Sequence, residues 1–213
     1  MVIYIATGNA GKVSEIKALV ESTLIDFLLK NSKCKEVSIL ARAPKNADEI
    51  ESTFKGNALI KAKALVEELI DEKPSYPFAV ISDDSGLEVK GLGGRPGVHS
   101  ARYAGDHANA VKNVEKLLNE LKDKSDDDRC CRYVCALTLW IQKENAQHQI
   151  YEAEGYCPGV ILEDAQGSGG FGYDPVFWSP ALKKRMSEAT LEEKNSLSHR
   201  SEAFLKLSAL FDS

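Results

Sequence analysis

Two adjacent carboxylates, Asp83 and Asp84, follow the apolar run 78–81 and come just before Ser85 and Gly86. We expect the strand to end at this pair, next to a tight turn, where acidic side chains are typical of metal ligands or catalytic bases. Successive side chains of an extended backbone point to opposite faces, so the two carboxylates are predicted to have different roles. The alternative is an ordinary acidic turn, which Asp-Asp-Ser-Gly alone would favour.

A second candidate is the segment 7–12, Thr-Gly-Asn-Ala-Gly-Lys, which joins a buried strand at 2–6 to a helix. Amides at the start of a helix, together with Lys12, suit an anionic phosphate. The segment is not a Walker A loop, because the four-residue gap between the glycines and the Ser or Thr after the lysine are missing. A plain capped turn is the alternative, and we favour phosphate binding.

Two later segments have features of nucleobase recognition. The glycine-rich stretch 167–175 has the spacing Gly-x-Gly-x-x-Gly, but it leads into a short strand at 176–178 rather than a helix, which excludes a dinucleotide fingerprint. Phe171 either stacks on a base or fills the space beneath the loop. The segment 194–200 places cations at the start of the last helix, where they oppose the helix dipole. That unfavourable placement hints at function, with a solvated first turn as the alternative.

Acidic residues also precede a long helix that we expect over 53–72. Glu49 and Glu51 lie just before this helix, and Lys61 lies on it. An acidic residue that folds back toward Asp83 and Asp84 could complete a divalent-cation site with hard oxygen ligands.

The apolar periodicity predicts an α/β protein with functional groups gathered at strand ends. Strands are expected at 2–6, near 37–40 and at 78–81, with a hairpin of 131–141 and 149–156, and helices are expected after Lys12, over 53–72 and over about 107–122. The closing helix follows a capping box at Thr190 and Glu193, and its apolar stripe comprises Phe204, Leu207, Leu210 and Phe211.

The composition is that of a globular protein large enough for one big domain or two lobes that share a core. The chain has 213 residues, of which 43% are hydrophobic, and a net charge of −5, which argues against binding to a nucleic acid polymer. No apolar run approaches a membrane span, and the N-terminus lacks the features of a signal peptide, so we expect a cytoplasmic protein without membrane contact. Five cysteines without a Cys-x-x-Cys pair favour reduced thiols over disulfides or zinc.

Six segments together resemble the inosine triphosphate pyrophosphatase family, and their details resemble its bacterial-type branch. The likeness runs through nearly the whole chain. The segments are Thr7-Gly8-Asn9-x-x-Lys12, Phe54-x-x-Asn57-Ala58-x-x-Lys61-Ala62, Ser82-Asp83-Asp84-Ser85-Gly86-Leu87, Pro96-Gly97-Val98-x-Ser100-Ala101-Arg102-Tyr103, Gly169-Gly170-Phe171-Gly172-Tyr173-Asp174-Pro175 and Lys194-x-x-x-Ser198-His199-Arg200.

The resemblance implies an α/β fold with a mixed, elongated central sheet flanked by helices, and two lobes with an active-site cleft between them. The whole chain, 1–213, would form one nucleoside triphosphate pyrophosphatase domain. The implied reaction is hydrolysis of a purine nucleoside triphosphate between the α and β phosphates, which gives a monophosphate and pyrophosphate. The resemblance also implies a requirement for Mg²⁺ and a homodimer.

By position, the resemblance makes Asp84 the proton acceptor and a metal ligand, with Glu49 and Asp83 as further metal-ligand candidates. The residues predicted to bind substrate are Thr7, Gly8, Asn9, Ala10, Gly11, Lys12, Lys61, Ser85, Phe171, Gly172, Tyr173, Asp174, Lys194, His199 and Arg200. A donor from Arg200 or His199 to the purine 6-oxo group would accept ITP, dITP and XTP and reject adenine, which carries an amino donor there. The residue that excludes guanine is not identified by the sequence.

Two alternatives stay open. The related septum-formation inhibitor family, which acts on pyrimidine or modified nucleotides, shares the general layout, although the segment 198–200 favours a 6-oxo purine. A nucleotide-sensing module without catalysis is the second alternative, and the intact Asp83, Asp84, Lys12 and Lys61 argue against it. The stretch 21–35 is longer than in compact bacterial members, and Arg185-Met186 interrupts a stretch expected to be smaller.

Overall fold

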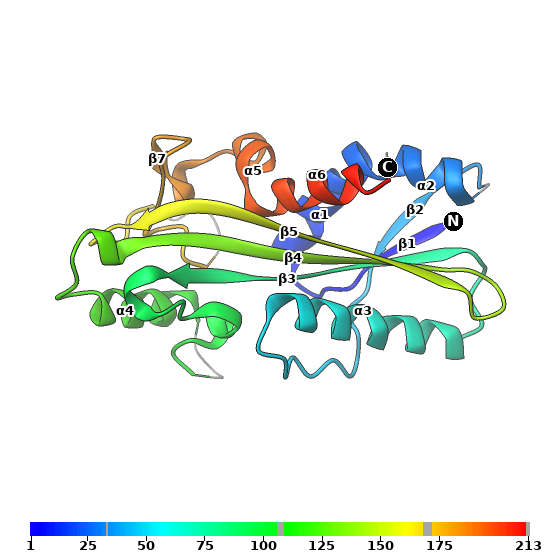
Figure 1. Cartoon of the computed structure of the whole chain (residues 1–213), viewed down its shortest axis with the longest axis horizontal. Helices are drawn as coiled ribbons and strands as arrows, with labels where there is room; N and C mark the ends of the chain where they lie inside the picture. The colour runs from blue at the N-terminus through cyan, green and yellow to red at the C-terminus, as the bar shows by residue number, and fades with distance from the viewer. Residues whose placement is uncertain (33, 106–108, 168–171, 212–213) are drawn as a thin grey trace. The chain divides into compact units, whose positions relative to one another are not determined.

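The computed structural model describes residues 1–32, 34–105, 109–167 and 172–211 (Figure 1). The helices are α1 (Ala10–Thr23), α2 (Ile25–Ser32), α3 (Phe54–Asp71), α4 (Ala110–Glu120), α5 (Leu191–Leu197) and α6 (His199–Ala209). The strands are β1 (Val2–Ile5), β2 (Ser38–Ala41), β3 (Phe78–Val89), β4 (Cys130–Gln142), β5 (His148–Ile161), β6 (Phe177–Ser179) and β7 (Lys184–Arg185). Short 3₁₀ turns cover Lys90–Leu92, Gly97–Arg102, Asp127–Arg129 and Met186–Glu188.

The strands form one sheet in the order β2-β1-β3-β4-β5-β6-β7. β1 is parallel to both β2 and β3, whereas the pairs β5–β6 and β6–β7 are antiparallel. The sheet is therefore mixed, and with its flanking helices it confirms the predicted α/β class. β4 and β5 are neighbours joined by a turn at 143–147, closed by a hydrogen bond from the Lys143 amide to the Gln147 carbonyl, so the predicted hairpin is confirmed.

Residue contacts divide the chain into two compact units. Unit 1 comprises Met1–Asp84, Ala136–Gly155 and Glu202–Ser213, and unit 2 comprises Ser85–Cys135 and Tyr156–Ser201. The unit boundary falls inside β3, β4 and β5, so each of these three strands contributes residues to both units.

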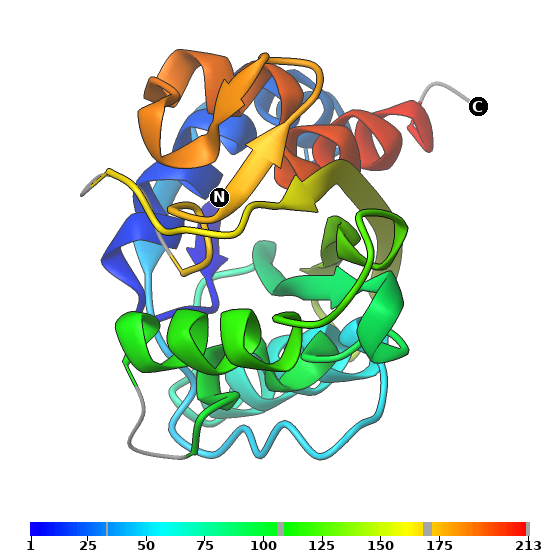
Figure 2. The same cartoon turned by 90° about the vertical axis from the view of Figure 1, so that its left-hand side faces the viewer.

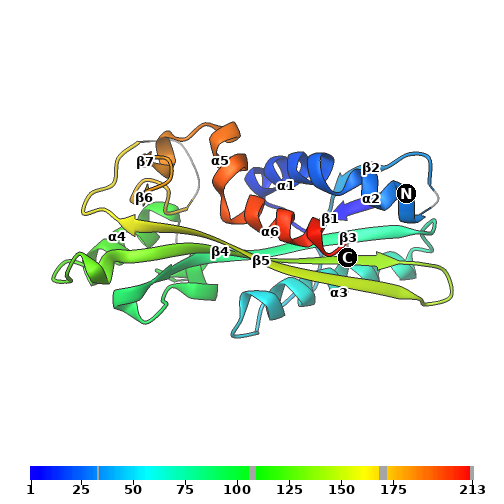
Figure 3. The ribbon, with the colours of Figure 1, turned by 45° about the horizontal axis from the view of Figure 1, so that its top comes forward.

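In unit 1, α3 covers one face of the sheet, and α1, α2 and α6 cover the other, as Figures 1 and 3 show. The side chains of α3 that face the sheet recur at helical spacing and pack on β3. The core here includes Ala62, Leu65, Val66, Leu69, Phe78 and Val80.

In unit 2, α4 lies on one side of the strands β3, β4 and β5, and β6, β7 and α5 lie on the other side (Figure 2). Its core includes Leu87, Val89, Leu117, Leu121, Tyr133, Ile161, Val176 and Phe177. The apolar residues of α4 recur at the helical spacing expected from the sequence, and Val114 and Leu117 among them are buried.

The expected strand end and turn at Asp83 and Asp84 are wrong, because β3 continues to Val89. Leu87 and Val89 alternate along the added segment and are completely buried in the core of unit 2. The amide of Leu87 donates to Ser100 Oγ at 2.8 Å. Burial and pairing with distant residues thus override the local turn preference of Asp-Asp-Ser-Gly.

The single closing helix is also corrected, because α5 ends and α6 begins around Ser198. Ser198 has an extended backbone, with φ −77° and ψ 160°, and its Oγ accepts the Ser201 amide at 3.2 Å. A serine at the start of a helix caps its first amides, so a separate helix begins after Ser198. The capping box of Thr190 and Glu193 is confirmed, but it belongs to the short α5.

Other differences are smaller. The helix α2 was not predicted. Leu28 of this helix and Leu24 just before it are buried, which explains why the long stretch after α1 packs within unit 1. The helix expected over about 107–122 runs from Ala110 to Glu120, and residues 106–108 lie outside the described part. In the described structure each of the five cysteines carries a thiol rather than a disulfide. Within the described residues, no helix combines the length and apolarity needed to cross a bilayer.

Candidate active site

The two carboxylates of β3 point to opposite faces of the sheet, as predicted from strand geometry. Asp83 forms an ion pair with Lys12 of α1 at 3.0 Å, and Asp84 forms one with Lys61 of α3 at 3.1 Å. Because α1 and α3 cover opposite faces of the sheet in unit 1 (Figure 1), Lys12 contacts Asp83 from one face and Lys61 contacts Asp84 from the other. Both carboxylates are buried, with residue exposures of 2% for Asp83 and 5% for Asp84.

Small residues allow α3 to approach β3 closely enough for these contacts. Ala58 and Ala62 are fully buried on the inner face of α3, and Ser82 Oγ donates to the carbonyl of Ala58 at 2.6 Å. Asn57 and Lys61 are four residues apart, so they lie on the same helix face. Thr53 caps the helix by accepting the Gly56 amide, which sets where that face begins.

Asp84 is held by two donors from α3. Lys61 Nζ contacts Oδ1 at 3.1 Å, and Asn57 Nδ2 donates to Oδ2 at 3.2 Å. Lys61 Nζ also lies 3.2 Å from a carboxylate oxygen of Glu49, so Glu49 and Asp84 share one ammonium group. The Oδ1 atom of Asn57 accepts the Glu51 amide at 3.0 Å, which fastens the loop carrying Glu49 to the helix.

Burial and charge shift the pKa values of this pair. Burial raises the pKa of Asp84 above its ordinary value, and the positive charge of Lys61 opposes that rise without cancelling it. Burial by itself would lower the pKa of Lys61, but Asp84, Asp83 and Glu49 outweigh it, so the pKa of Lys61 is raised. A buried carboxylate with a raised pKa beside a protonated lysine is typical of a catalytic base.

The segment 7–12 leads into α1, which begins at Ala10, and four of its amides donate within the chain. Asn9 Oδ1 accepts the amides of Gly11 and Lys12 at 3.0 and 3.2 Å, and Thr7 Oγ1 accepts the amide of Asn9 at 3.2 Å. This is the geometry of the capped turn that the sequence left as an alternative. Gly8, Ala10 and Gly11 are exposed, so phosphate binding by this loop stays a prediction.

The predicted nucleoside-binding residues gather in unit 2. Lys194 Nζ contacts Asp174 Oδ2 at 2.8 Å, and Arg200 Nη2 donates to Ser85 Oγ at 2.9 Å. His199 is buried, with its ring stacked on that of Tyr133 at a centroid distance of 5.1 Å.

The glycine-rich stretch is described only in part. Gly172 has a φ of +63°, in the left-handed region that favours glycine, and the Tyr173 hydroxyl donates to the Ser100 carbonyl at 2.8 Å. Phe171, the predicted stacking residue, lies outside the described residues.

Two residues at these clusters were not predicted as site residues. Asn57, which contacts Asp84, had a signal, because it lies four residues before Lys61 on a predicted helix. Tyr133 donates to Asp174 at 3.0 Å, and the sequence marks it only as one position of an alternating strand, which does not indicate a site residue.

The comparisons place the chain in a known family. The sequence profile of the Ham1 family matches residues 3–210. The chain belongs to the Ham1 family. A Ham1 protein of Staphylococcus aureus has a related structure, with a TM-score of 0.75 and 32% identity over 100% of this chain and 98% of that chain. The HAM1 protein of Coxiella burnetii has a TM-score of 0.79 at 29% identity, with the same coverage of both chains.

Relatives of the Ham1 chain at higher identity have functional names. A protein named dITP/XTP pyrophosphatase from Geobacillus kaustophilus (strain HTA426) is 45% identical over 205 residues, which cover 96% of this chain and 91% of the relative. A protein with the same name from Bacillus subtilis (strain 168) is 39% identical over 208 residues, covering 98% and 96%. These matches confirm the family resemblance drawn from the six sequence segments.

The acidic residues of this Ham1 chain suit a hard cation only in part. Within the described residues, no group of three or more His, Cys, Asp or Glu side chains is arranged to hold a metal. Glu49 and Asp84 nevertheless place two carboxylates around one ammonium, while Asp83 contacts Lys12 on the opposite face. Mg²⁺ is commonly bound by one or two carboxylates together with substrate phosphates, so the pair Glu49 and Asp84 fits that ion and Asp83 fits it less well.

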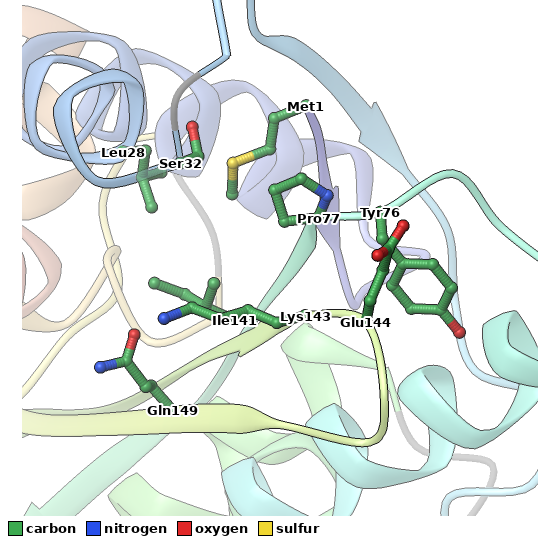
Figure 4. A pocket seen from close by; sticks show the side chains of 9 residues that line it. All are labelled: Met1, Leu28, Ser32, Tyr76, Pro77, Ile141, Lys143, Glu144 and Gln149. Carbon is green, nitrogen blue, oxygen red and sulfur yellow. The ribbon is translucent and has the colours of Figure 1, made fainter.

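A separate cavity of about 430 Å³ lies in unit 1 (Figure 4). It is lined by Met1, Leu28, Ser32, Tyr76, Pro77, Ile141, Lys143, Glu144 and Gln149. None of these is a predicted site residue, and the lining offers no pair of carboxylates. The predicted chemistry therefore has no counterpart in this cavity.

Proposed function

We propose that this Ham1 chain hydrolyses deaminated purine nucleoside triphosphates, namely ITP, dITP and XTP, to the monophosphate and pyrophosphate. Such an enzyme removes these nucleotides from the pool before polymerases use them. The family membership and the names of the relatives support the reaction class. The observation that carries the proposal is Asp84, a buried carboxylate with a raised pKa that Lys61 and Asn57 hold beside Glu49.

The unit 1 groups suit the triphosphate. Lys12 and Lys61 supply positive charge to phosphate oxygens, which lowers the barrier to attack by water on a strongly anionic substrate. Asp84 accepts the proton of the attacking water. Mg²⁺, when bound by Glu49 and Asp84, would neutralise further phosphate charge and make a bound water more acidic. The amides and side chains of 7–12 would bind the phosphate tail, in which case the phosphate competes with Asn9 for the helix-start amides.

The unit 2 groups suit the nucleoside. Arg200 and His199 provide donors for the purine 6-oxo group, whereas adenine would face them with its own amino donor. A buried donor left opposite another donor costs enough to reject adenine strongly. Ser85, Phe171, Gly172, Tyr173, Asp174 and Lys194 complete the proposed binding set.

We infer further that the chain acts as one domain, as a homodimer, and in the cytoplasm. Thiols at all five cysteines, rather than disulfides, support the proposal of a reducing compartment. The dimer follows from the family resemblance, and sedimentation of the purified protein measures it directly.

Product analysis on a nucleotide panel tests the proposal. With Mg²⁺, the protein is expected to release pyrophosphate and monophosphate from ITP, dITP and XTP much faster than from ATP, GTP or TTP, and chelation of the metal should stop the reaction reversibly. Equal rates on ATP or TTP would refute the selectivity. Release of orthophosphate would refute the bond assignment, and binding without product would indicate a sensing module.

A matched pair of variants tests the role of Asp84. Asp84→Asn preserves shape and should lower kcat by about 10²- to 10⁴-fold, the range that a general base contributes. Asp83→Asn, on the opposite face, should act mainly through Lys12 and raise KM. Normal turnover in Asp84→Asn, or an equal loss of kcat in both variants, would remove Asp84 from its proposed role.

A further inference from the structure

Tyr133 links the two predicted nucleoside-binding segments of unit 2. Its hydroxyl donates to Asp174 Oδ1 at 3.0 Å, and its ring stacks on His199 with an interplanar angle of 21°. The ring also stacks on Phe177 at a centroid distance of 4.5 Å. Tyr133 belongs to β4, so the rigid sheet holds both segments through one side chain.

Both oxygens of Asp174 receive donors from the chain. Tyr133 donates to Oδ1, and Lys194 Nζ lies 2.8 Å from Oδ2. Burial, with the negative charge of Asp174, raises the pKa of Tyr133 well above its ordinary value. The hydroxyl therefore stays protonated and donates throughout the working pH range. Held at both oxygens, the carboxylate has a fixed orientation and reduced capacity to accept further hydrogen bonds.

This arrangement bears on the exclusion of guanine. Guanine carries two parallel donors, N1–H and the 2-amino group, and a carboxylate with two available oxygens can accept both in a bidentate pair, as it does from arginine. Hypoxanthine has the N1–H donor but no 2-amino group. It therefore loses less binding energy than guanine when the carboxylate already accepts hydrogen bonds from the protein. An engaged Asp174 thus discriminates against guanine without any steric block.

We propose that Tyr133 is a positioning residue that determines purine specificity by holding Asp174 away from the donor pair of guanine. The proposal rests on the proposed function, because it takes Asp174 to face the base. Tyr133 acts through Asp174 and His199 and has no part in the bond-breaking step.

The experiment is Tyr133→Phe, which keeps the stacked ring and removes the hydroxyl. The ratio of kcat/KM for ITP to kcat/KM for GTP is expected to fall about tenfold, the scale of one hydrogen bond to a charged group. The change should appear mainly in KM. In the double variant Tyr133→Phe/Asp174→Asn the gain on GTP should vanish, because an amide offers one acceptor oxygen in place of two.

Tyr103→Phe is the matched control. Tyr103 is a similarly buried tyrosine of unit 2 whose hydroxyl donates to a carboxylate oxygen of Glu120 at 2.8 Å. It should leave the ITP to GTP ratio unchanged, with any loss of thermal stability comparable to that in Tyr133→Phe. An unchanged ratio in Tyr133→Phe, or the same change in both variants, would overturn the proposal.

Binding measurements separate this proposal from the proposed function. Calorimetric titration with IMP and GMP requires no turnover, so the same shift in preference can be measured in an inactive protein. A wild-type protein that hydrolyses no triphosphate would refute the proposed function, while the IMP to GMP ratio would still decide the role of Tyr133. A ratio that Tyr133→Phe does not change in that titration refutes the role.

Discussion

Gly159 of β5 is predicted to be essential for the packing behind His199. A Cβ atom added at this position would lie 2.8 Å or closer to three ring atoms of Phe177, a contact that real structures do not tolerate. Phe177 is completely buried and stacks on Tyr133, which in turn stacks on His199. Gly159→Ala must therefore displace the Phe177 ring, and the displacement passes along the stack to a predicted nucleoside-binding residue.

The size of the effect follows from two opposing terms. Overpacking a well-packed core costs about 1–3 kcal/mol, and replacing glycine by alanine recovers about 0.4–1 kcal/mol through the lower entropy of the unfolded chain. The net loss in the free energy of unfolding is about 1–2 kcal/mol. For a chain of this size that corresponds to a fall in Tm of about 2–8 °C. KM for ITP should rise more than kcat falls, because the stack holds a binding group.

Thermal unfolding and ITP kinetics should be measured on Gly159→Ala, Phe177→Leu and the double variant. The smaller side chain of Phe177→Leu leaves room for the new methyl group, so the two losses should be less than additive. A Tm for Gly159→Ala at or above the wild-type value would refute the packing argument. Strictly additive losses would show that the methyl group and the ring do not meet.

Two further predictions concern the ends of helices in unit 1. Asn9→Ala removes the cap on the first amides of α1 and should lower the free energy of unfolding by about 1 kcal/mol in urea titrations, whereas Asn9→Asp should retain the cap; equal stability of all three proteins would contradict this. The Arg42 hydrogen bonds lower the pKa of Glu72, so this pair stabilises the fold above the ordinary carboxyl pKa and loses its effect as the pH falls through the lowered value. The difference in Tm between wild type and Glu72→Gln should therefore be largest near neutral pH and disappear in acid, and a difference that persists in acid would show that the charge is not its cause.

Local sequence signals predicted the elements whose stabilising contacts are short in range. The long helix expected over 53–72 is α3, Phe54–Asp71, with Thr53 and Glu72 as its caps. It could be predicted because the capping residue and the apolar spacing both lie within this segment. The strand at the N-terminus and the hairpin of β4 and β5 were predicted for the same reason. The opposite orientation of Asp83 and Asp84 could be predicted from the two-residue period of a strand alone.

Distant contacts determined what the sequence did not predict. β3 continues past Asp84 because Leu87 and Val89 are buried among residues far along the chain. Tyr133 contacts Asp174 across 41 positions of sequence, and no local pattern of residues marks that pair. The candidate site residues were predicted as separate segments of sequence. The carboxylate that each lysine contacts depends on which face of the sheet its helix covers, and the segments alone do not show this.

The charges around β3 lead to a last prediction about the origin of the raised Asp84 pKa. In unit 1, the carboxylates of Glu49 and Asp84 share the ammonium group of Lys61, whereas Asp83 pairs with Lys12. Burial of the Asp84 side chain and the negative charge of Glu49 both raise the pKa of Asp84, and a buried carboxylate beside a like charge destabilises a fold, a cost that is typical of functional sites. Asp84→Asn removes that repulsion and can keep its hydrogen bond from Lys61, whereas Asp83→Asn removes the direct partner of Lys12. Without metal, Asp84→Asn should therefore unfold at the wild-type Tm or above it, and Asp83→Asn below it. A fall in Tm for Asp84→Asn as large as that for Asp83→Asn would show that the cluster serves stability, in which case the raised pKa of Asp84 would be no evidence for catalysis.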